Sequence, residues 1–466
     1  GDALGAGYEF GPAFEGPVAM KGGGPFGWEP GEWTDDTQMA ICIAQQAATG
    51  DLDLDELGDR FIAWSSEATD VGNQTRAVLS PAQNGSDLHA IAAQHYIRSP
   101  SHSAGNGSLM RTGPVALAYL GDRDRIAEVA ASISALTHAD PLAIDACVLW
   151  SLAIDEAIET GAIPEIRNGL SHLPADRRDN WTALIEDAEE RPQGVFTPNG
   201  FVVTAFQAAW SSIVHTPIPD DQPSRHLRAT LENAVRIGSD TDTVAAIAGA
   251  LLGAIWGSSA VPLEWKAAMH GWPGHTTTRD LVRLAMLTIN GGDDDGAGWP
   301  SAPDLLAYYE EHFPQEPLAV PLPEDPGTLI GNVAGTAIAG TDVVVSLCRM
   351  GSESLGPEHH DVWLLDEADP GANPHLDFVL DDTARFIAAQ RDAGKMVFLH
   401  CVRAESRTPT VAAAYLALRL GISGPEALER IRTVLPKARP NHGFLSALDR
   451  IEAHDAGDMR PGEETE

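Results

Sequence analysis

The chain has 466 residues and is strongly acidic, with 67 Asp and Glu against 30 Lys and Arg and a formal net charge of −37. This charge argues against a nucleic-acid backbone or an anionic membrane surface as partner, and we find no apolar window of about 18 residues that would span a membrane. At roughly 150 residues per domain, the length predicts two or three domains, and a hydrophobic content of 43% is enough to build their cores.

The cysteines give no sign of a disulfide framework or a metal site. The four cysteines lie far apart in the sequence and show neither a disulfide spacing nor a metal-ligand spacing; they are Cys42, Cys147, Cys348 and Cys401. This pattern favours a reducing, cytoplasmic compartment. The sequence opens at Gly1 without Met. We therefore expect residues ahead of it, where a targeting peptide would not be visible.

The N-terminal stretch leads from small residues to a first acidic cluster. Residues 1–9, GDALGAGYE, are typical of a closely packed helix start. Judged without any resemblance, Glu9 is expected to be an ordinary surface residue. Residues 11–32 are rich in Gly and Pro and predict a loop. The loop ends at Trp33-Thr34-Asp35-Asp36-Thr37, which opens onto a helix-like segment at 38–48.

The next part of the chain is predicted to be helical, at residues 52–66, 87–96, 125–160, 180–190, 201–215 and 226–235. Before the third of these helices lies SAGNGSLMR, residues 103–111. Its glycines would expose backbone N–H groups suited to a diphosphate, with Arg111 adding charge, and a plain turn is the alternative. His138 lies in a helix break, where a histidine is more often a structural hydrogen-bonding residue than a ligand.

A second acidic cluster, Gly238-Ser239-Asp240-Thr241-Asp242-Thr243, opens onto the apolar run 244–256. A strong helix N-cap is one interpretation. One Asp would suffice for a cap, however, and two acids at i and i+2 repel unless a cation lies between them. If this cluster and the first converge, their Asp carboxylates and Thr hydroxyls could hold a pair of Mg²⁺ or Mn²⁺ ions.

These motifs, in this order and together with Gly200-Phe201-Val202-Val203, resemble those of the ADP-ribosylglycohydrolase family over about residues 1–290. The resemblance implies an all-α orthogonal bundle holding two Mg²⁺ or Mn²⁺ ions. It implies as metal ligands Thr34, Asp35, Asp36, Asp240, Asp242 and Thr243. It further implies Glu9 as the catalytic residue, an ADP-ribose loop of Asn106, Gly107, Ser108 and Met110, and His138 as a substrate contact. Ser239 departs from the pattern, because a second Gly is usual there.

A change of composition marks the end of the first domain. We predict a helical domain at 1–291, a linker at 292–326 with five prolines between 314 and 326, and a second domain at 327–460. Strand-like segments at 341–347 and 397–399 alternate with helix-like segments at 374–394 and 408–420. This pattern predicts an α/β fold.

The second domain carries His400-Cys401-Val402-Arg403-Ala404-Glu405-Ser406-Arg407-Thr408. A strand ending in Cys, then five residues, an Arg and a helix is a layout that wraps backbone N–H groups around phosphate, with Cys401 as nucleophile and Arg407 as phosphate ligand. The stretch resembles the phosphate loop of dual-specificity and tyrosine phosphatases. By that resemblance Asp366 is the general acid and Asp369 its competitor.

The loop departs from active members of that family, which usually carry Ala-Gly where this chain has Arg403-Ala404. The lost Gly predicts a strained turn, and Glu405 adds a negative charge that Arg403 could offset. A phosphate-binding or degenerate module is therefore the alternative to an active phosphatase.

Together the motifs predict a hydrolase that removes ADP-ribose from a protein side chain or from an ADP-ribosyl small molecule. Cleavage of a bond to ribose develops oxocarbenium character, which a site of cations and a carboxyl group can serve. A phosphoprotein is a second expected partner. One alternative is a phosphatase whose helical domain only senses ADP-ribose or a nucleotide; another is a structural, non-catalytic helical domain.

Overall fold

The computed structural model describes residues 1–352, 355–356 and 358–453. These residues form two compact units. The first unit comprises Gly1–Val261 with Ala268–Asp293, and the second comprises Pro262–Ala267 with the chain from Asp294. Within the described residues, no helix is both long enough and apolar enough to cross a membrane.

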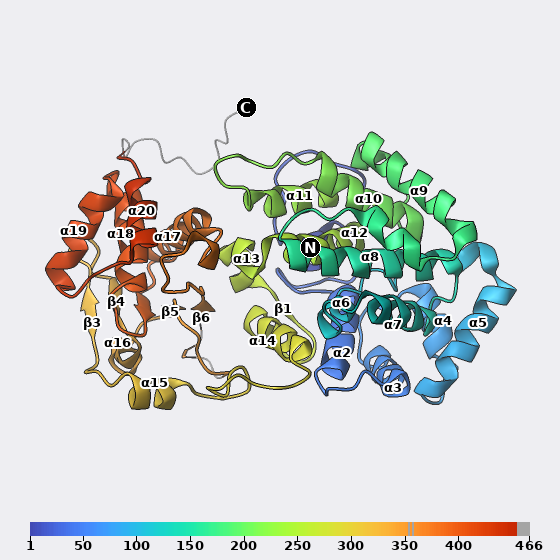
Figure 1. Ribbon diagram of the computed structural model, residues 1–466, viewed down its shortest axis with the longest axis horizontal. Helices are drawn as coiled ribbons and strands as arrows, with labels where there is room; N and C mark the ends of the chain where they lie inside the picture. The colour runs from blue at the N-terminus through green and yellow to red at the C-terminus, as the bar shows by residue number, and fades with distance from the viewer. Residues whose placement is uncertain (353–354, 357, 454–466) are drawn as a thin grey trace. The chain divides into compact units, whose positions relative to one another are not determined.

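The first unit is built of helices, as Figure 1 shows. Its named strands in the described chain are the two-residue β1 (His270–Gly271) and β2 (Thr276–Thr277). The longer helices match the expected ones within a few residues. Its helices are α1 (Asp2–Gly5), α2 (Asp35–Ala47), α3 (Leu54–Ser65), α4 (Asn73–Leu79), α5 (Leu88–Arg98), α6 (Pro114–Ala118), α7 (Arg123–Ala135), α8 (Pro141–Thr160), α9 (Ala175–Glu190), α10 (Val202–His215), α11 (Arg225–Arg236), α12 (Thr241–Trp256) and α14 (Thr278–Ile289).

Helix α12 is the central element of this unit and packs against α1, α8, α10 and α11. Its small apolar side chains allow these close approaches, because glycine and alanine let backbones come near one another. A Cβ atom added to Gly5 would lie 2.5 Å from the Cα of Asp242. The small residues of the N-terminal stretch are therefore needed to bring α1 onto the start of α12.

The predicted break at residues 137–141 separates α7 from α8. Asp140 caps α8 by accepting a hydrogen bond from the backbone N–H of Leu142 at 2.9 Å, and Pro141 occupies the first helical position. The short helices α4 and α6 and the longer α14 were not predicted.

The second unit contains a five-stranded sheet with the order β3-β4-β7-β5-β6. Only the β3–β4 pair is antiparallel; the other pairs are parallel. The strands are β3 (Ala319–Pro321), β4 (Thr328–Asn332), β5 (Val343–Ser346), β6 (Glu358–Asp361) and β7 (Val397–Cys401). The helices are α13 (Leu263–Ala268, whose last residue falls in the first unit), α15 (Leu306–His312), α16 (Thr336–Ala339), α17 (Leu376–Asp392), α18 (Arg407–Leu420), α19 (Gly424–Val434) and α20 (His442–Asp449). The α/β pattern expected here is present.

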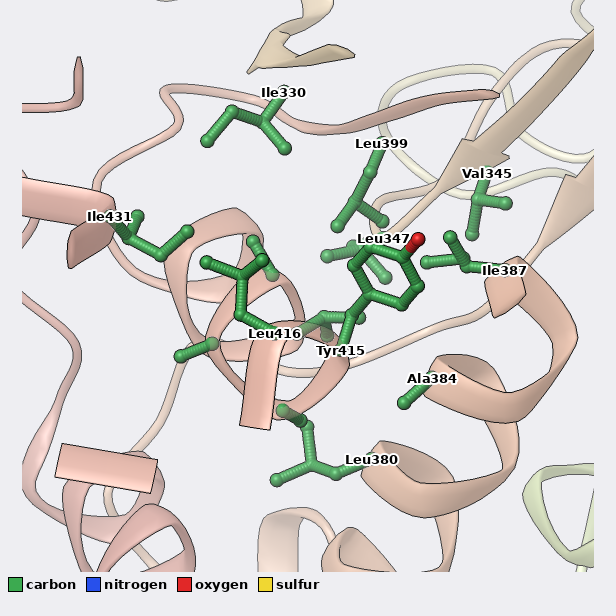
Figure 2. Packing of buried hydrophobic residues seen from close by; sticks show 14 of the residues in the cluster. Ile330, Val345, Leu347, Leu380, Ala384, Ile387, Leu399, Tyr415, Leu416 and Ile431 are labelled. Carbon is green, nitrogen blue, oxygen red and sulfur yellow. The ribbon is translucent and has the colours of Figure 1, made fainter. Parts of the chain in front are cut away.

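The core of the second unit lies between the sheet and helices α17 to α20. Strand β7 alternates, so that Val397, Leu399 and Cys401 belong to this core. Figure 2 shows Leu399 and Val345 of the sheet facing Tyr415 and Leu416 of α18, with Ile387 of α17 beside them. This packing fixes the C-terminal end of β7, where the cysteine lies, against the start of α18.

Residues 292–326, predicted as a linker, contribute α15 and strand β3, and β3 pairs with β4. Leu322, within this stretch, is fully buried in the core of the second unit. Residues 454–460 of the predicted second domain lie outside the described residues.

Candidate functional site

The two acidic clusters of the first unit lie together. Asp35 and Asp36 begin α2, and Asp240 immediately precedes α12, with Asp242 in its first turn. The hydroxyl of Thr34 donates to Asp36 at 3.0 Å and lies 3.5 Å from Asp242. The structure thus brings together two helix starts that are about two hundred residues apart in sequence.

The carboxylates are arranged to receive a cation. Oxygens of Asp2, Asp36 and Asp242 lie within 4.8 Å of one another, as do oxygens of Glu9, Asp240 and Asp242. One oxygen each of Glu9, Asp36 and Asp242 is buried without a hydrogen-bond partner in the described chain. Buried anionic oxygens normally have partners, so this donor set fits a hard divalent cation with oxygen ligands.

The electrostatics of the cluster lead to the same conclusion. Burial, followed by the charges of Asp70 and Asp2, raises the pKa of Asp35 well above its usual value. Burial, followed by the charges of Asp240 and Asp70, raises the pKa of Glu9 to about 8. Repulsion among these groups is what a bound cation would relieve.

Helix α2 is capped by Asp2, a residue that the sequence did not single out. The carboxylate of Asp2 accepts hydrogen bonds from the backbone N–H groups of Thr34 and Thr37, at 3.0 and 3.1 Å, and from the Thr37 hydroxyl. Thr34, the N-cap residue, makes no capping bond with its side chain. Asp35 and Asp36 are therefore not needed as caps, which weakens the purely structural interpretation of this cluster.

Of the predicted ADP-ribose loop, Asn106 reaches the acidic cluster directly. Its side-chain amide donates to Asp240 at 2.8 Å and to the backbone oxygen of Asn199 at 3.1 Å. A Cβ added to Gly107 would lie 3.2 Å from the ring of His138, so the glycine lets the histidine pack against the loop.

Ser108, Met110 and His138 are buried in the unit's interior. The Ser108 hydroxyl accepts from Ser134 at 2.9 Å, and the His138 ring is hydrogen-bonded to Thr137 at 2.7 Å. The His138 ring lies beside the two glycines of the loop.

Arg111 does not supply charge at the loop surface as expected. Its side chain is fully buried, stacks on Phe61 at 4.7 Å and donates to the Thr137 hydroxyl at 2.7 Å. Burial lowers its pKa to about 10. The expectation was wrong because the loop turns this side chain into the interior.

Asn199 was also missed, in a segment where we found no motif. It is fully buried; its side-chain oxygen accepts from the Asp240 backbone N–H at 2.8 Å, and its amide donates to the Gly238 carbonyl at 3.2 Å. Asn199 thus braces the turn into the second acidic cluster. Asp70, in the loop before α4, was the other carboxylate missed, and its charge acts on Asp35 and Glu9.

Ser239, where the family usually has Gly, adopts the left-handed conformation with φ +65°. Two backbone hydrogen bonds hold it, from Phe10 N–H to the Ser239 carbonyl at 2.6 Å and from Ser239 N–H to the Gly11 carbonyl at 2.8 Å. A glycine would adopt this conformation without strain, and Ser239 removes no carboxylate from the cluster.

The second unit presents a separate candidate site in the loop from Cys401 to Arg407, defined here as the cysteine loop. Cys401 ends β7 and Arg407 begins α18. Within the described chain, no acceptor is found for the backbone N–H groups of residues 402–407. Unpaired N–H groups at a strand-to-helix turn form an anion-binding concavity.

The side chains around the cysteine loop are held by specific contacts. Arg407 donates to the backbone carbonyls of Leu347 and Leu364 at 3.0 and 3.1 Å, and its Nε is buried without a partner in the described chain. Ala404 has φ +57°, so the predicted strain is present. Arg403 stacks on Phe313 and forms no ion pair with Glu405 among the described residues, so the expected charge offset is not made by direct pairing.

Asp366 lies against the cysteine loop, whereas Asp369 is engaged elsewhere. One oxygen of Asp366 accepts from the Ser406 hydroxyl at 2.6 Å. Asp369 caps a short 3-10 helix by accepting from the Gly371 backbone N–H at 2.9 Å. Of the two carboxylates, Asp366 is therefore the one that contacts the cysteine loop.

Comparisons with known proteins cover the first unit most fully. Residues 1–294 match the family model described as ADP-ribosylglycohydrolase. The chain is 28% identical over 277 residues to ADP-ribosylarginine hydrolase Tri1 of Serratia proteamaculans, covering 57% of this chain and 71% of the relative. It is 31% identical over 288 residues to Tri1 of Pseudomonas putida, covering 59% and 72%. A crystal structure of human DUSP28 covers 30% of this chain and 95% of its own, at 25% identity and a TM-score of 0.27.

Proposed function

The chain belongs to the ADP-ribosylglycohydrolase family, and from this premise we propose that its first unit removes ADP-ribose from modified protein side chains or from a related ADP-ribosyl substrate. The proposal includes two Mg²⁺ or Mn²⁺ ions at the acidic cluster. The observation that carries it is the convergence of Asp36, Asp242 and Glu9, each with a buried, unpartnered oxygen in the described chain.

The proposed ligands of the ions are Thr34, Asp35, Asp36, Asp240, Asp242 and Thr243. When bound, the ions would orient ribose hydroxyls and supply positive charge beside the attacking water. Asn106 holds Asp240 by donating a hydrogen bond to its carboxylate at 2.8 Å. Glu9, whose Oε2 has no partner in the described chain, acts as acid or base at the scissile bond.

The names of the two relatives favour an arginine linkage. Both are ADP-ribosylarginine hydrolases, and we extend that substrate class to this chain. A side-by-side assay with Arg-linked and Ser-linked ADP-ribosyl peptides, with Mg²⁺ or Mn²⁺ and with EDTA, tests both the linkage and the requirement for cations. Equal turnover of both linkages, or turnover unaffected by EDTA, would contradict this part of the proposal.

The acidic cluster is tested by Asp35→Ala and Asp240→Ala, which we expect to abolish hydrolysis while the helical circular dichroism is retained. Asp53→Ala is the matched control. Asp53 is also a carboxylate at a helix start, but it caps α3 by accepting from the N–H groups of Asp55 and Glu56. The control loses about 1 kcal/mol of stability and keeps full activity. Retained turnover in either cluster variant would remove the metal mechanism.

A second function, phosphate monoester hydrolysis, is favoured by the cysteine loop of the second unit. We propose that the Cys401 thiolate attacks phosphorus and forms an S–P bond while the P–O bond breaks and Asp366 gives its proton to the departing oxygen. Water then attacks phosphorus, gives a proton to the Asp366 carboxylate, and the S–P electron pair returns to sulfur. Arg407 and the unpaired N–H groups of the loop hold the phosphate oxygens.

Hydrolysis of phenyl phosphate that disappears in Cys401→Ser tests this second function. Comparison of turnover on ADP-ribosylated protein and on phosphopeptide separates the two-enzyme proposal from its alternative, a phosphatase whose first unit only senses ADP-ribose or a nucleotide. Phosphopeptide turnover without any ADP-ribosyl hydrolysis would favour that alternative.

A further inference from the structure

The candidate general acid of the second unit is held by two donors on the same oxygen. Asp366 Oδ1 accepts from the Ser406 hydroxyl at 2.6 Å and from the Asn441 side-chain amide at 3.1 Å. Ser406 belongs to the cysteine loop, and Asn441 is the N-cap residue of α20. The two donors come from segments about 35 residues apart in sequence, and both contact this carboxylate oxygen.

Asn441 is itself fixed rigidly. Its side-chain oxygen accepts from the Phe444 backbone N–H at 3.0 Å, and its own backbone N–H donates to the Ser406 hydroxyl at 3.3 Å. Phe444 is fully buried in the core of the second unit. Since the cap bond fixes the oxygen of the amide, the amide nitrogen is directed at Asp366.

The segment that carries Asp366 also packs along the start of α20. A Cβ added to Gly443 would lie 3.0 Å from the backbone carbonyl of Ala368. Farther back, Arg407 donates to the Leu364 carbonyl at 3.1 Å, which ties the same segment to the cysteine loop. The acid-bearing segment is thus held at one end by the start of α20 and at the other by Arg407 of the cysteine loop.

We propose that Asn441 is a positioning residue for Asp366, an inference that rests on the phosphatase chemistry proposed above. With Oδ1 occupied by two donors, the transferable proton resides on Oδ2, which has no hydrogen-bond partner in the described chain. The Asn441 amide, together with the Ser406 hydroxyl, fixes Oδ1 and so leaves Oδ2 to face the leaving oxygen of a bound phosphate monoester.

A capping role alone does not account for this geometry, and the two roles separate by substitution. Asn441→Ser keeps a good N-cap, because Ser caps helices about as well as Asn, but it removes the amide donor. Ser423→Ala is the matched control, because Ser423 caps α19 of the same unit and accepts from the Glu426 backbone N–H at 3.4 Å. The control loses a cap without touching Asp366.

The readout is the dependence of kcat/KM on the leaving group. Phenolate is a poor leaving group and needs the acid, whereas 4-nitrophenolate departs with little help. General acid catalysis contributes about 10²–10⁴-fold, so we expect Asn441→Ser to lower kcat/KM on phenyl phosphate by roughly 10–100-fold and on 4-nitrophenyl phosphate by less than about 3-fold. Asp366→Asn gives the larger loss, and adding Asn441→Ser to it causes no further loss.

Each outcome distinguishes the inference from its premise. Equal losses on both substrates, or an additive loss in the double variant, would overturn the role of Asn441 while phosphatase activity stands. A selective loss in Ser423→Ala would also overturn it, since that variant leaves Asp366 unchanged. If the unsubstituted protein releases phosphate no faster than Cys401→Ser, the phosphatase proposal fails and the inference fails with it.

Discussion

Replacement of Asp242 by Asn is expected to stabilise the metal-free protein and to abolish its stabilisation by divalent cations. Asp242 is buried, and its oxygens lie within 4.8 Å of those of Asp36 and Asp2 in one group and of Glu9 and Asp240 in another. Burial, followed by the charges of Asp36 and Asp240, raises its pKa well above the usual value. Asn keeps the shape of the side chain and removes its charge.

The magnitude follows from the spacing of the charges. At an effective dielectric constant of about 20, two unit charges about 5 Å apart repel by roughly 3 kcal/mol. Protonation of the cluster limits this repulsion, so we expect a gain of about 1–3 kcal/mol without metal, or roughly 2–8 °C in melting temperature. In the unsubstituted protein, a cation at about 100 times its Kd contributes about 2.7 kcal/mol.

Differential scanning calorimetry with EDTA and with excess Mn²⁺ measures both effects. Asp145→Asn is the control, because Asp145 is a buried carboxylate paired with Arg177 at 2.7 Å and lies outside the cluster. It should melt lower in both conditions and keep the shift caused by Mn²⁺. If Asp242→Asn melts below the unsubstituted protein in EDTA, or still gains stability with Mn²⁺, the reasoning about repulsion and cation binding is refuted.

Three further predictions concern single residues. Asn199→Ala should weaken Mn²⁺ binding, measured by calorimetric titration, about 10–100-fold. The control is Gln207→Ala, which removes a buried amide that donates to the Leu184 carbonyl, and it should leave Mn²⁺ binding unchanged. Equal effects of the two variants would show that Asn199 has only a structural role. Ala404→Gly should raise the stability of the second unit by about 0.5–1 kcal/mol, because it relieves a left-handed alanine, and a loss in denaturant unfolding would contradict the strain. Burial raises the pKa of Asp325, but hydrogen bonds from Arg391, Thr328 and Tyr415 outweigh it, so the pKa falls to about 2. These bonds contribute about 1–2 kcal/mol of stability, which is present above pH about 4 and is lost as the pH falls toward 2. Asp325→Asn should abolish that part of the acid dependence of unfolding, and an unchanged acid profile would refute the assignment.

The acidic clusters were recognisable in the sequence because their chemistry is local. Asp35 and Asp36, like Asp240 and Asp242, stand at helix starts and carry more charge than a cap requires. Their supporting residues could not be recognised in the same way. Asp2 acts on a helix start 32 residues later, and Asn199 acts on Asp240, so only the folded chain makes these pairs visible.

Periodicity over several turns made most of the longer helices predictable, although the 12-residue α14 was missed. Helices α8, α10 and α12 are long and continuous, whereas α4 and α6 are too short to establish a period. Arg111 was misplaced for a related reason. A charged residue beside two glycines indicates an exposed loop, but its burial depends on Phe61 and Thr137, which are contributed by α3 and by the turn after α7.

Strained backbone conformations occur at both candidate sites. Among the described residues, the non-glycine residues with positive φ are Phe10, Ser239 and Ala404. Phe10 follows Glu9, Ser239 precedes Asp240, and Ala404 lies within the cysteine loop. Each left-handed residue costs about 1–2 kcal/mol and persists only where its surroundings enforce it.

Reciprocal backbone hydrogen bonds enforce the first two, between Phe10 and Ser239 and between Ser239 and Gly11. At the cysteine loop, the Arg439 backbone N–H donates to the Glu405 carbonyl at 2.5 Å and holds the turn that follows Ala404. The cost of the left-handed Ala404 is therefore offset by contacts around the loop, whereas a glycine there would carry no such cost.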